Sequence, residues 1–213
     1  MSLDRIFNAE SVAIIGASRN ETKRGYQAIR TLLDEKYEGK IYPVNPKEKS
    51  ILGFKCYMSV TDIDEPIDVA LVATPAKTLP SVLADCGKKG VKGAVVLAGG
   101  FGEIGSDGRK LEDDMVAAAK KHNIRLVGPN TSGMLNLKDN LNLVGLKDAP
   151  RGDIALLTQS GNMALTLITE AKIKSRKGFS YYVGVGNEAD IKFHEYLEFF
   201  RQDPDTRAIL MYV

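Results

Sequence analysis

Short apolar runs alternate with amphipathic stretches along most of the chain. In the first part, these runs are nearly continuous in Val, Ile, Leu and Ala, which is typical of parallel strands buried on both faces. We predict such strands at residues 12–16, 40–44, 68–74, 93–99 and 124–128. The helical periodicity between them predicts helices near residues 25–36, 77–89 and 108–122. This alternation favours a doubly wound parallel α/β domain over residues 1–130, with right-handed crossovers.

Residues 131–152 interrupt this pattern. The segment is rich in Asn, Gly and Asp, and its apolar alternation at 135–137 and 141–144 predicts a small hairpin within a linker. A second α/β series then occupies residues 153–213. Its predicted strands and helices lie at 153–158, about 161–173, 178–185, about 190–202 and 207–213. Because so short a unit buries little surface and the sequence ends within a predicted strand, we expect 153–213 to be the first part of a truncated domain.

The composition limits the possible partners. A net charge of +2, with 44% hydrophobic and 26% charged residues, gives no electrostatic case for a nucleic acid or a membrane surface. No apolar run approaches the roughly 20 residues of a membrane span, and the N-terminus lacks a signal-peptide pattern. Cys56 and Cys86 have no metal-ligand spacing. We therefore expect a cytoplasmic protein with no metal site, no nucleic-acid partner and no membrane partner.

The first predicted strand runs into a loop suited to phosphate. In SVAIIGASRNETKRGYQAIRTL, residues 11–32, Gly16 and Ser18 lie in the loop and Gly25 lies near the start of the helix. This arrangement presents backbone N–H groups and the positive end of a helix dipole to an anion. Lys23 and Arg24 can add charge to a phosphate contact. The glycines do not follow G-x-G-x-x-G, and a plain turn with two surface cations is the alternative that the loop alone leaves open.

The end of the second predicted strand discriminates between phosphate-bearing ligands. An NAD site places an Asp or Glu there to accept hydrogen bonds from the ribose hydroxyls. Here the strand ends as YPVNPKEK, and Lys47 stands in that region. A lysine attracts a ribose phosphate, so the sequence favours CoA or NADP over NAD. A surface charge without a ligand remains the alternative for Lys47.

Further residues are predicted at the same edge of the sheet. Pro75 follows the third strand, and Gly99 and Gly100 follow the fourth. Ligands of open α/β sheets lie outside the carboxyl ends of the strands, and glycines there permit close approach to the backbone. These positions therefore extend the candidate site along the edge.

A second candidate anion site opens the second series. In LLTQSGNMALTLI, a buried strand is followed by Ser160, Gly161 and Asn162, which begin a helix. Their N–H groups and the helix dipole suit an anion. A nucleophilic serine is disfavoured, because the G-x-S-x-G elbow is absent. Neither histidine has an obvious triad partner: His122 is predicted at a helix C-terminus and His194 on a helix flank.

Several motifs together carry a family resemblance. In chain order they are IIGASRN, KRGY, YPVNPK, DVALVATPA, GGFGE, RLVGPNTSGMLN, LLTQSGNMA, GFSYYVGVGNEAD and DPDTRAILMYV. The chain thereby resembles the NDP-forming acyl-CoA synthetases, which include the ADP-forming acetyl-CoA synthetases and are relatives of the succinyl-CoA synthetase α subunit. The resemblance implies a Rossmann-like CoA-binding domain followed by a partial flavodoxin-like domain of the succinyl-CoA synthetase type.

The resemblance also implies roles for individual residues. The loop from Ser18 to Gly25 would hold the CoA phosphates, and Lys47 would lie near the phosphorylated adenosine portion. Pro75 and the turn formed by Gly99, Gly100 and Phe101 would line the CoA path. Asn130 of GPNTSG would lie near the acyl-phosphate and phosphohistidine site. The helix begun by Ser160, Gly161 and Asn162 would stabilise the histidine-bound phosphate.

The implied reaction interconverts acyl-CoA, phosphate and NDP with acid, CoA and NTP through a phosphohistidine. The family's phosphorylated histidine lies beyond Val213, so we expect no catalytic residue in this chain. ADP or ATP with Mg²⁺ would bind through a nucleotide-grasp domain or β subunit, while CoA and a small carboxylic acid or acyl-CoA are the expected ligands. Thr131 stands where many relatives have Cys and Asn162 where many have Ala, which leaves the acyl group open. We expect the chain alone to bind CoA without turnover.

Two other functions remain compatible with the sequence. One is a non-catalytic CoA-binding regulatory module of a multidomain protein such as an acyltransferase. The other is an NADP-dependent oxidoreductase, which is disfavoured because nothing in the chain marks a domain for a hydride-accepting substrate.

Overall fold

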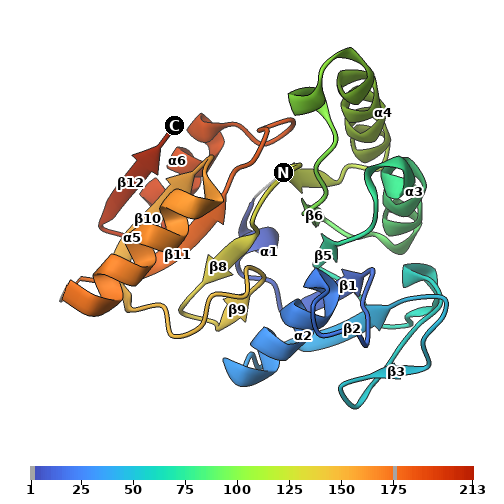
Figure 1. Ribbon diagram of the computed structural model, residues 1–213, viewed down its shortest axis with the longest axis horizontal. Coiled ribbons are helices and arrows are strands. Elements are labelled where there is room, and N and C mark those ends of the chain that lie inside the picture. Colours follow the sequence, from blue (N-terminus) through green and yellow to red (C-terminus); the bar gives the residue numbers. More distant parts are fainter. Residues whose placement is uncertain (1–2, 175–176) are drawn as a thin grey trace.

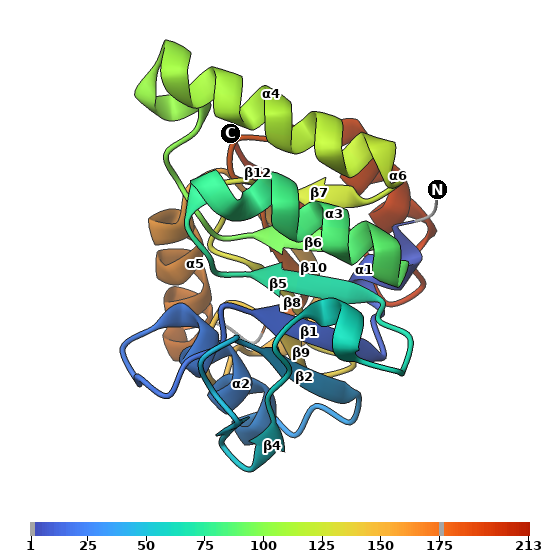
Figure 2. The same ribbon diagram turned by 90° about the vertical axis from the view of Figure 1, so that its right-hand side faces the viewer.

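Five parallel strands form the first sheet, in the order β2-β1-β5-β6-β7. The computed structural model describes residues 3–174 and 177–213. The strands of this sheet are β1 (Ser11–Ile15), β2 (Lys40–Val44), β5 (Val69–Val72), β6 (Gly93–Val96) and β7 (Arg125–Val127). β1 pairs with β2 on one side and with β5 on the other, so the strand order reverses between β1 and β5 (Figures 1 and 2). The predicted doubly wound α/β fold is confirmed.

Three helices cover the two faces of this sheet. They are α2 (Arg24–Asp34), α3 (Leu79–Lys89) and α4 (Ser106–Lys121). Successive residues of a strand point to opposite faces. Accordingly, Val12 and Ile14 belong to the core on the α2 side, whereas Ala13 and Ile15 belong to the core beneath α3 and α4. The continuous apolar runs of the sequence therefore reflect burial on both faces.

Short elements that the periodicity did not predict complete the first unit. They are α1 (Asp4–Phe7), the hairpin β3 (Ser50–Ile51) and β4 (Phe54–Lys55), and the 3₁₀ turns η1 (Val60–Asp62), η2 (Ala76–Thr78) and η3 (Gly102–Ile104). Each is too short to repeat a helical or strand period, which explains why the sequence pattern missed them.

The second sheet is mixed and has the order β12-β10-β11-β8-β9. Its strands are β8 (Met134–Asn136), β9 (Leu141–Asn142), β10 (Arg151–Thr158), β11 (Phe179–Gly184) and β12 (Ala208–Tyr212). The helices α5 (Gly161–Lys174) and α6 (Phe193–Gln202) lie between its parallel strands in sequence. Within residues 3–174 and 177–213, no helix has the length and apolarity needed to cross a membrane.

The hairpin predicted within residues 131–152 is present as β8 and β9. It does not stand apart as a linker, because β8 pairs antiparallel with β11, with Leu135 opposite Tyr182. The segment therefore contributes two strands to the second sheet. The domain limits proposed from the sequence, at residues 130 and 153, stay a prediction.

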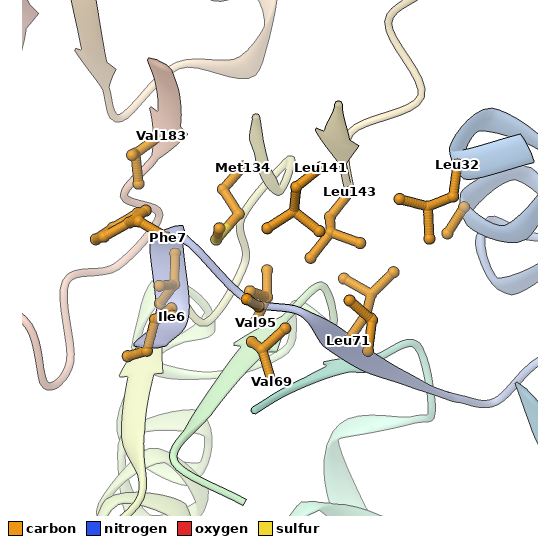
Figure 3. Packing of buried hydrophobic residues seen from close by; sticks show 14 of the residues in the cluster. Ile6, Phe7, Leu32, Val69, Leu71, Val95, Met134, Leu141, Leu143 and Val183 are labelled. Carbon is orange, nitrogen blue, oxygen red and sulfur yellow. The ribbon is translucent and has the colours of Figure 1, made fainter. Parts of the chain in front are cut away.

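The two sheets share one hydrophobic core. Val69, Leu71 and Val95 of the first sheet are all fully buried and belong to the same cluster as three residues of the hairpin segment. Figure 3 shows these three, which are Met134, Leu141 and Leu143, lying over the first sheet beside Leu32 of α2. Full burial of each such side chain is worth about 1.5–3 kcal/mol. We call these six residues of the first sheet and the hairpin segment the shared core.

An aromatic cluster extends the shared core. Phe7 of α1 is 0% exposed, and its ring centroid lies 6.3 Å from that of Tyr181, 6.0 Å from Tyr196 and 4.9 Å from Phe199. Rings at these separations gain stabilisation beyond their area burial, especially when they meet edge to face. The N-terminal helix thus contacts the second sheet and α6 at once.

A charged cluster connects β7 of the first sheet to α6 and the segment before it. Arg125 Nε donates to Asp190 at 2.9 Å, and its Nη2 donates to Glu195 of α6 at 2.9 Å. The N–H of Leu126 also donates to Asp190, at 2.8 Å. Desolvation raises the pKa of Glu195, but hydrogen bonds from the Lys192 N–H and from Arg125 outweigh it and hold that pKa below its ordinary value.

We predict that Phe7→Ala lowers the free energy of unfolding by about 3–5 kcal/mol, because it leaves a cavity among rings from β11 and α6. Urea unfolding followed by far-UV circular dichroism measures the change. The matched control is Ile173→Ala on α5, where the side chain is 70% exposed and the change should stay within about 0.5 kcal/mol. A loss below about 1 kcal/mol for Phe7→Ala would contradict this account of the core.

Candidate functional site

A pocket of about 350 Å³ lies at the carboxyl ends of β1, β2 and β5, where the strand order reverses. This is the switch point at which open α/β sheets bind ligands, and the volume is within the usual range for small-molecule sites. We call it the crevice. Its walls come from the ends of the three strands and from α3, and the lining residues include Gly16, Asn45, Pro46, Val60, Pro75 and Val82.

The start of α2 rests directly on the loop that follows β1. Gly16 has φ +86°, and a Cβ there would lie 3.0 Å from the backbone of Ala73. A Cβ on Gly25 would lie only 2.3 Å from the Gly16 carbonyl oxygen. Both positions therefore require glycine for close backbone approach. The predicted loop glycines serve to bring a helix N-terminus onto the edge of the crevice.

The N-terminus of α2 has no side-chain cap. Lys23 occupies the N-cap position in an extended conformation, and its side chain makes no capping hydrogen bond. The first N–H groups of a helix need acceptors, and an anion can supply them. Ser18 Oγ accepts from the Asn20 N–H at 3.1 Å, and Asn20 Oδ1 accepts from the Thr22 N–H at 2.9 Å. These local bonds shape the loop in front of the helix.

Asn45 connects the second strand to this loop. Its Nδ2 donates to the Ala17 carbonyl at 2.6 Å, and its Oδ1 accepts from the Lys47 N–H at 2.8 Å. Lys47 is exposed and forms no ion pair with any described residue. Lys23 is likewise exposed and without an ion pair over residues 3–174 and 177–213. The sequence did not single out Asn45, although an Asn directly after a strand is a common turn residue.

The remaining residues predicted at this edge differ in their accessibility. Pro75 lines the crevice. Gly99 is exposed, and a Cβ on it would lie 3.1 Å from Asn130 Oδ1. The Gly100 N–H donates to Glu103 at 2.6 Å. The Phe101 side chain is 0% exposed in the core beneath α3 and α4, so only its backbone can face a ligand.

The loop 128–133, with sequence GPNTSG, passes from the first sheet to the second. Its Asn130 N–H donates to the Ala98 carbonyl at 2.8 Å, and Asn130 Nδ2 donates to Asn187 at 3.3 Å. The Thr131 hydroxyl donates to the Gly184 carbonyl. Asn130 therefore lies where three segments meet: the turn that follows β6, this loop, and residues 184–189.

Glu103 closes this junction from the other side. It accepts from Asn187 Nδ2 at 2.6 Å, and the same amide donates to Glu112 of α4 at 2.9 Å. Desolvation raises the pKa of Glu103, but the hydrogen bonds from Asn187 and the Gly100 N–H more than offset this and lower the pKa. Glu103 is therefore held in its charged form, and it connects the turn after β6 to Asn187, which follows β11.

The second predicted anion site begins α5. The Ser160 N–H donates to Thr158 Oγ1 at 2.9 Å, and Ser160 Oγ accepts from the Met163 N–H at 3.3 Å. Ser160 thus caps the helix, while Gly161 and Asn162 are exposed beside it. A Cβ on Gly161 would lie 3.2 Å from the Cβ of Ser132, which places this helix start against the loop 128–133.

Arg24 connects the two predicted anion sites. Its Nη2 donates to the Ser132 carbonyl at 2.8 Å, and the Ser132 hydroxyl forms a hydrogen bond with the Tyr182 hydroxyl. Burial raises the pKa of Tyr182, so that hydroxyl stays protonated. The starts of α2 and α5 therefore both contact Ser132. The sequence treated these sites as separate, because nothing local relates residues so far apart.

The histidines and cysteines are not among the residues that line the crevice. His122 ends α4, and a Cβ on Gly87 of α3 would lie 2.2 Å from its ring, so it packs between the two helices. His194 is exposed in the first turn of α6. Burial raises the pKa of Cys86 to about 12, and Cys56 is also buried. None of the four side chains is placed to react with a ligand in the crevice.

Comparisons with known proteins agree with this arrangement. Residues 10–136 match the family model of the CoA binding domain. This chain belongs to that family. Residues 151–213 match the succinyl-CoA ligase like flavodoxin domain. The first match covers the three strand ends that form the crevice, and the second begins with β10.

Acetate–CoA ligases are among the relatives whose sequences match this chain. The chain is 44% identical to the α subunit of the ADP-forming acetate–CoA ligase I of Pyrococcus furiosus, covering 100% of this chain and 47% of that subunit. It is 43% identical to the ADP-forming acetate–CoA ligase of Methanocaldococcus jannaschii, covering 96% of this chain and 28% of that protein. The chain thus spans about half or less of the length of these relatives.

Solved structures show the same fold. The dinucleotide-forming acetyl-coenzyme A synthetase 1 of Ca. Korarchaeum cryptofilum, in its apo form, superposes with a TM-score of 0.95 at 38% identity. The match covers 100% of this chain and 46% of that one. The resemblance seen in the sequence motifs to the α-type region of ADP-forming acyl-CoA synthetases is therefore confirmed.

We predict that Gly25→Ala destabilises the fold by about 1–3 kcal/mol, because the new methyl group would overlap the Gly16 carbonyl. The change opposes the usual gain of about 0.5–1 kcal/mol for alanine over glycine in a helix. Urea unfolding measures it. The control is Gly102→Ala, whose Cβ would meet a side-chain carboxylate, that of Glu112, at 3.2 Å and no closer backbone atom, so its loss should be smaller. A Gly25→Ala variant as stable as the parent chain would contradict the close contact.

Proposed function

We propose that this chain is the CoA-binding α-type portion of an ADP-forming acyl-CoA synthetase. One observation carries the proposal: Gly16 and Pro46 line the crevice at the β1–β5 switch point, and next to them in space or sequence are the uncapped N-terminus of α2 and the exposed, unpaired Lys47. Membership of the CoA binding domain family supports it. The position of Lys47 favours a nucleotide with a phosphorylated ribose, and CoA is such a nucleotide.

The residues of the crevice fit CoA by charge and by shape. Gly16, Ser18, Gly25 and the N-terminus of α2 would receive the diphosphate, with Lys23 close enough in sequence to add charge. Lys47 would bind the ribose phosphate. Apolar side chains of the pocket, among them Val60 and Val82, would pack against the base. Pro75, Gly99 and Gly100 would border the path of the thiol arm toward Asn130.

In the whole protein, we propose the reversible conversion of acyl-CoA, phosphate and ADP into acid, CoA and ATP. The free energy of the thioester would be retained in an acyl phosphate and then in a phosphohistidine, whose N-phosphate stays reactive. Ser160, Gly161 and Asn162 would stabilise the phosphoryl group with N–H groups and the helix dipole. The acyl group remains open in this proposal.

Other parts of the protein would complete the reaction. Neither His122 nor His194 faces the crevice, which supports a phosphorylated histidine outside this chain. A nucleotide-grasp domain or β subunit would bind ADP and Mg²⁺. One structure of the related Ca. Korarchaeum cryptofilum synthetase is described as a complex with phosphate and ADP. We therefore propose that this chain alone binds CoA without turnover.

We predict that the chain binds CoA but not NAD, because β2 is followed by Asn45, Pro46 and Lys47 and not by an acidic residue that would accept from an unmodified ribose. NADP should bind more weakly than CoA, because the family model that the chain matches is a CoA binding domain. Isothermal titration calorimetry with the three ligands measures the order of affinity. Binding of NADP with no binding of CoA would reject the synthetase proposal and favour an oxidoreductase.

We predict that Lys47→Glu weakens CoA binding by about tenfold or more, because the new carboxylate repels the ribose phosphate. Binding of dephospho-CoA, which lacks that phosphate, should stay unchanged. The control is Lys110→Glu on α4, an exposed lysine outside the crevice that carries the same charge change. Equal weakening of both ligands by Lys47→Glu would remove Lys47 from the ribose-phosphate role.

A further inference from the structure

Arg24 connects helix α2, which packs on the first sheet, to the loop 128–133, which leads into the second sheet. It is the first residue of α2, yet its guanidinium donates to the carbonyl of Ser132, 108 positions further along the chain. A guanidinium has five N–H donors. Over residues 3–174 and 177–213, the Ser132 carbonyl is its one hydrogen-bond acceptor, so the other donors are available to an anion at the α2 N-terminus.

Ser132 is held tightly on the side that faces the second sheet. Its hydroxyl is hydrogen-bonded to the buried Tyr182 hydroxyl. A Cβ on Gly184 would lie 2.4 Å from Ser132 Oγ, and one on Gly161 would lie 3.2 Å from Ser132 Cβ. Ser132 therefore lies against the backbone of β11 and the start of α5, and a shift of Ser132 would press on them. A force on Ser132 is therefore transmitted to α5.

We propose that Arg24 is a positioning residue that couples the N-terminus of α2 to the N-terminus of α5 through Ser132. The inference rests on the proposed function, in which CoA binds at α2 and a phosphoryl group at α5. An anion at α2 orders the Arg24 side chain through its remaining donors. The ordered guanidinium then fixes Ser132 against α5. The anion at α5 therefore binds without the entropic cost of ordering this loop.

The chemistry of arginine suits this role. Its planar guanidinium can donate in two directions at once, toward a carbonyl and toward a phosphate, whereas a lysine ammonium behaves as a single compact charge. Arg24→Lys should therefore retain the attraction for CoA and lose the coupling. This distinguishes a positioning residue from a cation whose only contribution is charge.

The first experiment measures the coupling directly. Calorimetry gives the Kd of CoA for the 213-residue chain with and without saturating inorganic phosphate. Phosphate should tighten CoA binding about fivefold, the lower range of typical coupling. In Arg24→Ala and Arg24→Lys the ratio should fall to about one, while Arg24→Lys, which keeps the positive charge, should bind CoA alone within about threefold of the parent chain. The control Arg30→Ala removes an exposed arginine of the same helix, paired with Asp34 at 3.0 Å, and should keep the full ratio.

Two outcomes would overturn the proposal. If Arg24→Ala keeps the coupling ratio, whatever its effect on CoA affinity alone, Arg24 does not couple the two sites. If phosphate leaves the CoA affinity of the parent chain unchanged, or weakens it by competition, the two sites are not positively coupled. Absence of CoA binding to the parent chain would instead reject the proposed function.

A second experiment needs no ligand. Hydrogen exchange of the peptide that covers residues 128–133 reports how firmly the loop is held. Loss of a hydrogen bond from a charged donor should speed exchange there about tenfold in Arg24→Ala and leave it unchanged in Arg30→Ala. Unchanged exchange in Arg24→Ala would overturn the positioning role, whatever the result with CoA.

Discussion

The packing of the hairpin β8–β9 is the interaction on which the rest of the structure depends. Met134 of β8 belongs to the core shared with the first sheet, whereas its neighbour Leu135 belongs to the core beneath α5. Strand β8 therefore packs against the first sheet with one face and toward α5 with the other, through alternate side chains. A slip of one residue would turn each side chain into the wrong layer, so the pairing of Leu135 with Tyr182 is strongly specified.

The form of the candidate site follows from this packing. Because β8 joins the second sheet while lying against the first, the loop 128–133 must cross the carboxyl edge of the first sheet to reach it. That route places Asn130 beside Gly99 and Ser132 beside Gly161. The two helix N-termini then lie on either side of one loop, and the polar ties of Glu103 and Arg125 hold the second part in place. A site with contributions from both sheets arises from the arrangement of the hairpin.

The sequence predicted what depends on local pattern and on strand direction. The strand expected at residues 12–16 is found at Ser11–Ile15, and the helix expected at 25–36 is found at Arg24–Asp34. Since carboxyl ends of parallel strands share one edge, the location of the crevice followed from the same pattern. The roles of individual residues at that edge stay predictions.

Features set by distant contacts escaped the sequence pattern. The pairing of β8 with β11 joins segments more than 40 positions apart, with Met134 opposite Val183. Helix α1 is too short to show a period, although Phe7 is central to the aromatic cluster. The direction of Arg24 and the burial of Phe101 depend on neighbours that only the fold supplies. In each case the deciding partner lies far away in sequence.

In the function that we propose, the affinity of the crevice for anions would come from unpaired positive charges beside it, because the net charge of +2 is too small to supply it. Acidic side chains around the crevice have partners of their own: Glu48 pairs with Arg19 at 2.9 Å, and Asp85 pairs with Lys88 at 2.8 Å. Among the residues described, Lys23 and Lys47 have no such partner. Lys23 and Lys47 thus place unpaired positive charge at the start of α2 and after β2, beside the β1–β5 switch point. A bound nucleotide with phosphates at two separated positions would satisfy both lysines, whereas a single phosphate would satisfy one.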